Sequence, residues 1–174
     1  MVGTVAPGFA KNSRRIQQID LSPQLWRGRR LRIDLTEMRD LTKRLISEEL
    51  RLGSASDTES HAAFRVCEKL RHVLSTFAGV AGFRSLLARA LVLAKADVPW
   101  LAKLKIKGDG SFENTAEIES HLVQAEAAKG GIALIDQLLS LLITFIGEEL
   151  TLRLMHELWP KASVRNSKSK GNRT

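Results

Sequence analysis

The sequence has one cysteine, Cys67, and no tyrosine among its 174 residues. A single cysteine excludes an intrachain disulfide and any zinc site built from several thiolates. The lack of tyrosine removes one common acid–base side chain. A chain of this length can still bury roughly 70% of its unfolded surface, so an apolar core is enough to hold it.

Long uncharged runs are also missing. The longest, residues 72–83 and 137–147, have about a dozen residues, whereas a membrane-spanning helix needs roughly 20. The first 15 residues contain no apolar core of the kind that a secretory signal has. We therefore expect a cytoplasmic protein without a membrane span.

Positive charge is concentrated at the two ends of the chain. The net charge is +8, to which residues 1–33 contribute +6 and residues 161–174 contribute +5, so that residues 34–160 carry −3. We expect a disordered N-terminal tail (1–13), one helical domain with a basic N-terminal arm (14–160) and a flexible basic C-terminal tail (161–174). Such ends can be drawn to nucleic acid, anionic lipid or acidic protein, or can keep the protein soluble.

The basic arm has the sequence WRGRRLR, and a short helix is expected to start before it at Ser22-Pro23. An aromatic ring among arginines can stack on bases or on a partner's aromatics while the guanidinium groups contact phosphate or carboxylate. The alternative is a solvated connection. The candidate binding residues for nucleic acid or an acidic surface are Trp26, Arg27, Arg29, Arg30 and Arg32.

Helix signals follow the arm. Asp34 and Glu37 have capping-box spacing and predict a helix that ends before Gly53. Ser56 and Glu59 repeat this spacing and predict the start of the next helix. Two glycines within residues 77–83 predict a break or corner. A further helix, from about residue 83 to 96, should end before Pro99.

Residues 103–113 change to an alternating pattern around Asp109-Gly110, which predicts a small β-hairpin with its lysines in water. We expect Trp100, Ile106 and Phe112 to anchor it on the helices. Another helix should run from Asn114 to Gly130-Gly131, and a long one from Ile132 to Trp159. The predicted fold is all-α, an orthogonal array or bundle of five to six helices with one small hairpin.

Residues 132–146 leave almost no polar face on the last helix, which predicts a central, buried position or a face covered by a second subunit. Leu138, Leu142 and Phe145 are the candidate oligomer interface. Asp136 is expected one turn into this helix, where a carboxylate favours the dipole. Glu148-Glu149 are expected to cap a neighbouring element or to pair with Arg153.

The motifs of common catalytic sites are missing. The sequence has no phosphate-binding GxxxxGK[ST], no GxGxxG and no GxSxG. His156-Glu157 begins like HExxH, but Pro160 stands at the second histidine. We predict no metal site, no cofactor and no catalytic residues.

Arg65 and His72 have an R-x6-H spacing that resembles the RNA-cleaving helical family called HEPN, in which the pair acts from one helix across a dimer cleft. The resemblance covers two residues and would imply a ribonuclease. Val66 stands where that family usually has a polar residue. The alternative is two ordinary exposed side chains on an amphipathic helix.

The leading hypothesis is a non-enzymatic interaction protein: a regulatory, adaptor or assembly subunit that uses an apolar helix face and basic ends, with a protein partner or a second copy. The alternatives are a nucleic-acid-binding protein that uses the arm and tail, and a HEPN-like ribonuclease.

Overall fold

The first helix, α1 (Leu35–Leu52), begins and ends where its sequence predicts. The Asp34 carboxylate accepts a hydrogen bond from the backbone N–H of Glu37 at 2.7 Å, and the Glu37 carboxylate accepts one from the N–H of Asp34 at 3.3 Å. These two bonds form the predicted capping box, and Gly53 follows the last turn. The buried apolar side of α1 is Met38, Leu41, Leu45 and Ile46.

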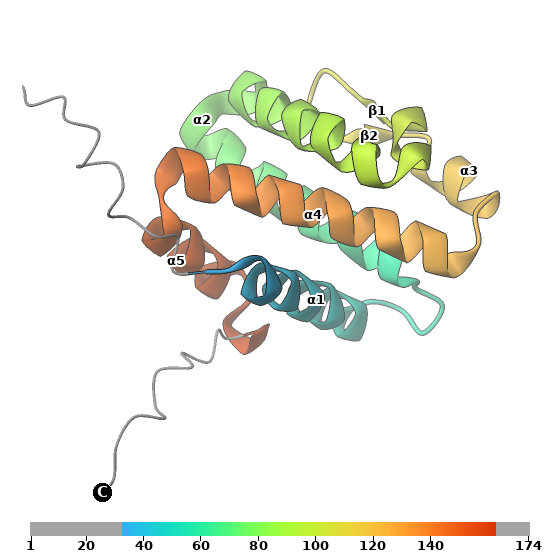
Figure 1. Cartoon of the computed structure of the whole chain (residues 1–174), viewed down its shortest axis with the longest axis horizontal. Coiled ribbons are helices and arrows are strands. Elements are labelled where there is room, and N and C mark those ends of the chain that lie inside the picture. The colour runs from blue at the N-terminus through green and yellow to red at the C-terminus, as the bar shows by residue number, and fades with distance from the viewer. Residues whose placement is uncertain (1–32, 163–174) are drawn as a thin grey trace, which may run out of the picture. The chain divides into compact units, whose positions relative to one another are not determined.

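The structure is a computed structural model, and it describes residues 33–162. The described residues form five α-helices and one two-stranded antiparallel sheet, which confirms the predicted all-α fold with one hairpin (Figure 1). The expected helix at Ser22-Pro23, the tails and the basic arm at 26–32 lie outside the described residues, apart from Lys161 and Ala162.

The second helix, α2 (Glu59–Asp97), is capped by Thr58, whose hydroxyl accepts a hydrogen bond from the backbone N–H of His61 at 3.3 Å. The predicted cap at Ser56 is wrong. Residues 54–57 close a turn of their own, in which the Asp57 N–H donates to the Ser54 carbonyl at 2.9 Å. The chain is therefore free to enter a helix only after this turn.

A sharp corner divides α2 at Gly79, with φ 73° and ψ 163°, and confirms the predicted break. This backbone conformation is open essentially to glycine alone. The other glycine of this segment, Gly82, stays helical. The second half of α2 ends at Asp97, as Pro99 predicts, and a short 3₁₀ helix (Pro99–Lys103) follows.

The hairpin forms as predicted. Strand β1 (Lys105–Ile106) pairs antiparallel with β2 (Phe112–Glu113), and Gly110 adopts a positive φ of 83° in the turn. The Phe112 ring meets the Phe64 ring of α2 edge-on, with 5.2 Å between ring centroids. The predicted anchors are half-buried and pack against the core: Trp100, Ile106 and Phe112. The lysines predicted to face water are exposed: Lys103, Lys105 and Lys107.

The C-terminal part of the described chain contains three helices instead of two: α3 (Thr115–Ser120), α4 (Gln124–Ile146) and α5 (Glu148–Leu158). The predicted continuous helix over residues 132–159 is wrong. Gly147 has φ 88° and ψ 159°, so it ends α4 and begins α5 in a different direction. The corner has the same backbone conformation as Gly79.

Two adjacent glycines, Gly130 and Gly131, lie inside α4, so the prediction that they end a helix is also wrong. A Cβ atom on Gly130 would overlap the Trp100 ring, and one on Gly131 would lie 2.6 Å from the Cβ atom of Ala63. The Trp100 Nε1–H donates to the Glu126 carbonyl at 3.0 Å. The glycines therefore allow close packing on α4.

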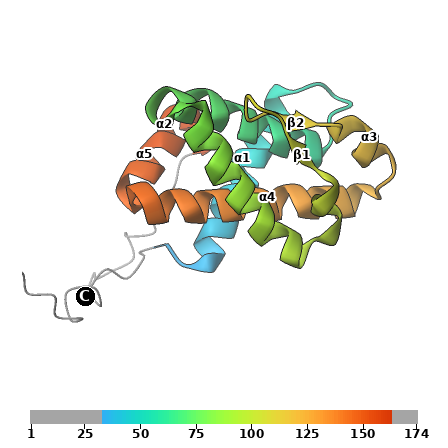
Figure 2. The ribbon, with the colours of Figure 1, turned by 90° about the horizontal axis from the view of Figure 1, so that it is seen from above.

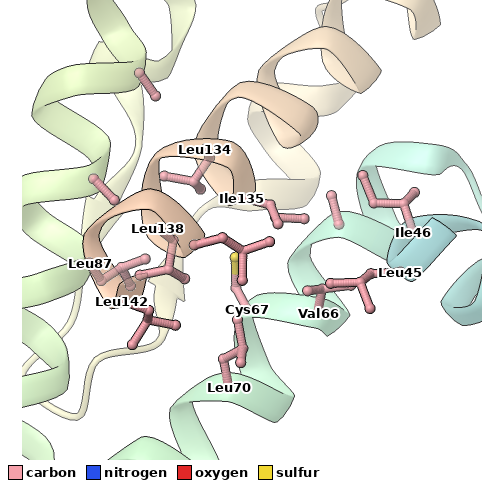
Figure 3. Packing of buried hydrophobic residues seen from close by; sticks show 14 of the residues in the cluster. Leu45, Ile46, Val66, Cys67, Leu70, Leu87, Leu134, Ile135, Leu138 and Leu142 are labelled. Atoms are coloured by element: carbon pink, nitrogen blue, oxygen red, sulfur yellow. The ribbon is translucent and has the colours of Figure 1, made fainter. Parts of the chain in front are cut away.

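The core surrounds α4, which takes the central position that its apolar sequence predicts. Figures 1 and 2 show α4 between α1 on one side and the second half of α2 on the other, with the first half of α2 alongside. Figure 3 shows the side chains that meet there: Leu134, Ile135, Leu138 and Leu142 of α4 with Leu45 and Ile46 of α1, and Val66, Cys67, Leu70 and Leu87 of α2.

Candidate functional site

The predicted binding residues fall into two groups. All five of the basic arm lie outside the described residues. Of the candidate oligomer interface, Leu138 and Leu142 are buried in the chain's own core, whereas Phe145 is 71% exposed. The structure therefore separates these three residues, and only Phe145 is open to a partner in this fold.

Phe145 belongs to an apolar corner between α4 and α5. Ile146 is 38% exposed and Leu150 is 52% exposed, and both lie within five residues of Phe145 in sequence. A Cβ atom on Gly147 would meet nothing within 4 Å, so this side of Gly147 faces open space. Scattered exposed apolar residues are ordinary, but a group of them can mark an interaction site. We call Phe145, Ile146 and Leu150 the α4–α5 corner surface.

The other corner repeats the same four-residue pattern. The sequence T-F-x-G occurs at 76–79 and again at 144–147. In both copies the threonine hydroxyl donates to the carbonyl four residues earlier, at 3.1 Å from Thr76 and 2.9 Å from Thr144. Phe77 is 80% exposed, like Phe145. The same short sequence therefore builds the same corner twice, each with an outward phenylalanine.

Both corners lie at the same end of the described unit. In Figure 1 the turn of α2 and the junction of α4 with α5 are both at the left, and Figure 2 places them at the left again after a quarter turn. The fold therefore presents two exposed phenylalanines, Phe77 and Phe145, at one end.

The charges around the two corners differ. Glu148 and Glu149 stand in the first turn of α5, where carboxylates favour the helix dipole. The segment between Glu68 and Asp97, by contrast, contains no acidic residue. One corner is therefore locally acidic, and the other continues into a basic helix.

The most enclosed charged group in the described chain is Glu49, which is 2% exposed. Its carboxylate accepts a hydrogen bond from Trp159 Nε1 at 2.6 Å and pairs with Lys69 Nζ. The Lys69 ammonium also lies 5.7 Å from the centroid of the Trp159 ring. The Arg65 guanidinium lies 3.7 Å from the same carboxylate. This cluster joins α1, α2 and the end of α5, and its carboxylate is fully engaged by structural partners.

Asp136 lies in the middle of α4, because this helix starts at Gln124, so the predicted role at the helix start is wrong. Its carboxylate accepts a hydrogen bond from the Thr42 hydroxyl and one from Arg39 Nε at 3.4 Å. Burial raises the pKa of Asp136, against the opposing effect of these two hydrogen bonds. Asp136 therefore links α4 to α1.

Ser60, His61 and Glu119 are residue types of a hydrolase triad, but their contacts are not those of one. The Ser60 hydroxyl donates to the Glu119 carboxylate, and His61 Nε2 lies 2.7 Å from the other oxygen of that carboxylate. Histidine activates a serine only when the two are hydrogen-bonded to each other. Here both bind the acid, which ties the start of α2 to α3.

The Arg65 and His72 pair lies on α2, as the predicted helix requires. The Arg65 guanidinium donates to the Asp57 carboxylate and to the Glu49 carbonyl, both at 2.9 Å, and thus holds the α1–α2 loop. His72 is exposed. The contacts of Arg65 are structural, so this part of the chain offers no support for the ribonuclease reading.

Residues 33–162 contain no group of three or more histidine, cysteine, aspartate or glutamate side chains placed to hold a metal ion. Two helices, α2 and α4, are long and apolar enough to cross a membrane by length and composition, although the core helices of soluble proteins pass the same criterion. The most apolar 18-residue stretches of α2 and α4 are 28% and 44% buried within the structure. The expected absence of a membrane span stays a prediction.

Sequence reasoning identified Phe145 but missed Phe77, Ile146 and Leu150, and it did not find Glu49. The repeated T-F-x-G was the available signal for the corners. No sequence signal marks Glu49, because its burial depends on Trp159, which is 110 residues away. Comparison with protein-family models, with curated proteins and with solved structures finds no significant match to this chain.

Proposed function

We propose that this protein is a non-enzymatic interaction protein, a regulatory, adaptor or assembly subunit, that docks through the α4–α5 corner surface. The observation that carries the proposal is the exposure of Phe145, Ile146 and Leu150 around one corner. Their proposed occupant is a second copy of the chain.

The energy available from this surface sets what else the interface must contain. Fully burying a large apolar side chain contributes about 1.5–3 kcal/mol, but Phe145, Ile146 and Leu150 are only 71%, 38% and 52% exposed. Together they supply roughly 2–5 kcal/mol from each copy before the costs of association. A micromolar complex needs about 8 kcal/mol after those costs. The corner surface can therefore anchor an interface but needs polar contacts beside it.

The outer face of α5 offers such contacts to a second copy. Glu149 and Arg153 are both exposed, and neither has an ion pair with another residue of the described part. They are one helical turn apart, on the same side as Leu150. Two α5 helices packed antiparallel about a point near Leu150 would place each Glu149 beside the partner's Arg153, as a two-fold interface requires.

The test is the mass of the full-length protein in solution, measured by size-exclusion chromatography with light scattering over a range of concentrations. We expect a concentration-dependent dimer that Phe145→Ser shifts to monomer. Leu52→Ser is the matched control, because Leu52 is also exposed but lies at the end of α1. A monomer at all concentrations, or equal effects of the two substitutions, would contradict self-association through this surface.

A charge-reversal pair sharpens this test. Glu149→Arg and Arg153→Glu should each weaken the dimer, and the double variant should restore it, because the proposed cross-pair is then re-formed in reverse. If the double variant does not restore the dimer, the proposed antiparallel arrangement is wrong, and only the apolar contact remains to explain self-association.

A second candidate function, nucleic-acid binding through the basic ends, is favoured by the charge distribution. The ends carry +6 and +5, against −3 for residues 34–160. Phosphate contacts of this kind give binding that weakens steeply with salt. We expect Arg29→Gln with Arg30→Gln to weaken binding of a fluorescent oligonucleotide and to reduce its salt dependence. Unchanged anisotropy curves would argue against the arm.

A further inference from the structure

The second half of α2, after Gly79, presents an outer face that no other described element covers. Its inward residues, Phe83, Leu87, Ala90 and Ala94, are buried. The residues that point the opposite way by helical spacing, about 100° per residue, are small or apolar and exposed. They are Ala81, Ser85, Ala88, Val92 and Ala96.

Basic side chains flank this outer face on both sides. Arg84 and Lys95 project along one flank by helical spacing, and Arg89 projects along the other. All three are exposed, and none forms an ion pair with another residue in the described range. No acidic residue occurs from 69 to 96, whereas five lysines and arginines do.

The Gly79 corner lies at the N-terminal end of this half of α2. Phe77 and Val80 are exposed on either side of Gly79, and Val92 is 47% exposed further along the helix. In Figure 1 this half of α2 lies along the upper edge of the described unit, and Figure 2 shows it crossing above α4. The face is thus on the outside of the fold, on the opposite side of α4 from α1.

We propose that this surface, defined by Ala88 and Val92 with Arg84, Arg89 and Lys95 beside them, lies on an anionic lipid membrane. A helix whose small and apolar outer residues have cations on both flanks suits a planar interface, because the outer residues meet the acyl boundary while the cations reach the headgroups. The charge selects an anionic surface. A nucleic acid would gain little from the strip itself, because its backbone presents phosphates and sugars rather than an apolar layer.

This inference goes beyond the proposed function and uses a different surface from the α4–α5 corner. A protein that binds a second copy through the α4–α5 corner surface and a membrane through the second half of α2 is an adaptor at a membrane surface.

Vesicle flotation of the full-length protein tests the proposal. We expect it to float with phosphatidylcholine vesicles that contain about 30% phosphatidylserine, and much less with phosphatidylcholine alone. Arg84→Gln with Arg89→Gln should weaken partitioning about thirty-fold, which corresponds to two cations at about 1 kcal/mol each. Lys43→Gln with Arg44→Gln on α1 removes the same charge from the opposite side and should have little effect.

A fluorescent label measures whether the apolar strip itself enters the interface. In the variant Val92→Cys, an environment-sensitive dye is attached to the new thiol, and the buried Cys67 stays unlabelled in the folded protein. We expect the emission to shift to the blue on anionic vesicles, and no shift from Ser47→Cys on α1. Equal effects of the two charge-removing pairs, an unshifted Val92 label, or arginine-dependent binding of an oligonucleotide without vesicle binding would overturn the proposal.

Discussion

Cys67 is fully enclosed in the core, and its surroundings determine its chemistry. Burial raises the pKa of its thiol to about 12, and the neighbouring Glu68 carboxylate acts in the same direction. At pH 8 only about one molecule in ten thousand then carries the reactive thiolate. We predict that Ellman's reagent labels the native protein no faster than the protein unfolds, and labels it at once in denaturant.

An exposed cysteine provides the comparison for this measurement. Ser47→Cys places a thiol on the outer side of α1, where Ser47 is exposed. It should react rapidly in the folded protein, while Cys67 stays protected in the same molecule. Two fast thiols in the native state would mean that the core around Cys67 opens far more readily than its burial implies.

Asp136 makes stability depend on pH in the direction opposite to most carboxylates. Burial raises its pKa above the usual 3.8, so the folded protein holds this proton more tightly than the unfolded chain does. Its contribution therefore favours folding at acidic pH and is lost as the pH rises above 3.8 and through the raised value. Asp136→Asn abolishes this titration.

The difference in unfolding free energy between the wild type and Asp136→Asn isolates the contribution of this carboxyl group. We expect the wild type to lose stability relative to the variant as the pH rises above 3.8 and through the raised pKa, as measured by urea unfolding from acidic to neutral pH. If the wild type instead gains stability with pH, the hydrogen bonds from Thr42 and Arg39 outweigh the cost of burial.

At the scale of elements, the two glycine corners depend on the backbone alone. Gly79 and Gly147 have positive φ and ψ near 160°, and a Cβ atom on either would meet nothing within 4 Å. We therefore predict that Gly79→Ala and Gly147→Ala each lower the free energy of unfolding by about 1–3 kcal/mol, the cost of this conformation for other residues.

Gly108 is the matched control for this prediction. A Cβ atom there also meets nothing within 4 Å, but its φ is not in the positive range. Gly108→Ala should change the unfolding free energy by less than about 0.5 kcal/mol in the same denaturant titration. Equal effects at all three positions would show that the corners relax without strain.

The glycines also show where sequence reasoning works for elements and where it fails. A glycine predicts a break in a helix, and this correctly marked the end of α1 at Gly53 and the corner at Gly79. The same reasoning failed at Gly130 and Gly131, because their role is to admit Trp100 and Ala63, which are distant in sequence. Gly147 was missed because the apolar pattern continues across it.

For the whole molecule, the sequence predicted the fold class, the hairpin and the central position of the most apolar helix. It could not predict which parts of α4 are covered, because that depends on how α1 and both halves of α2 pack around it. Leu138 and Phe145 belong to one continuous apolar pattern in the sequence, yet Leu138 is buried and Phe145 is exposed. The candidate surface follows from tertiary packing.

The Glu49 cluster joins the beginning of the described chain to its end. Glu49 of α1 accepts the Trp159 indole N–H and pairs with Lys69 of α2. Removal of the carboxylate leaves a buried indole N–H without its acceptor and Lys69 without its counter-ion. We predict that Glu49→Ala lowers the unfolding free energy by about 2–4 kcal/mol.

The neighbouring Glu48 separates this effect from a general loss of charge. Glu48 pairs with Arg51 at the surface, so Glu48→Ala should leave the urea midpoint almost unchanged. Glu49→Gln should fall between the two alanine variants, because its amide oxygen still accepts the Trp159 N–H while the charge is lost. Limited proteolysis should then cut Glu49→Ala preferentially within α5, since the contact that holds its end to α1 is gone. If both alanine variants unfold at the same urea concentration, α5 is held by its apolar contacts alone, through residues such as Met155.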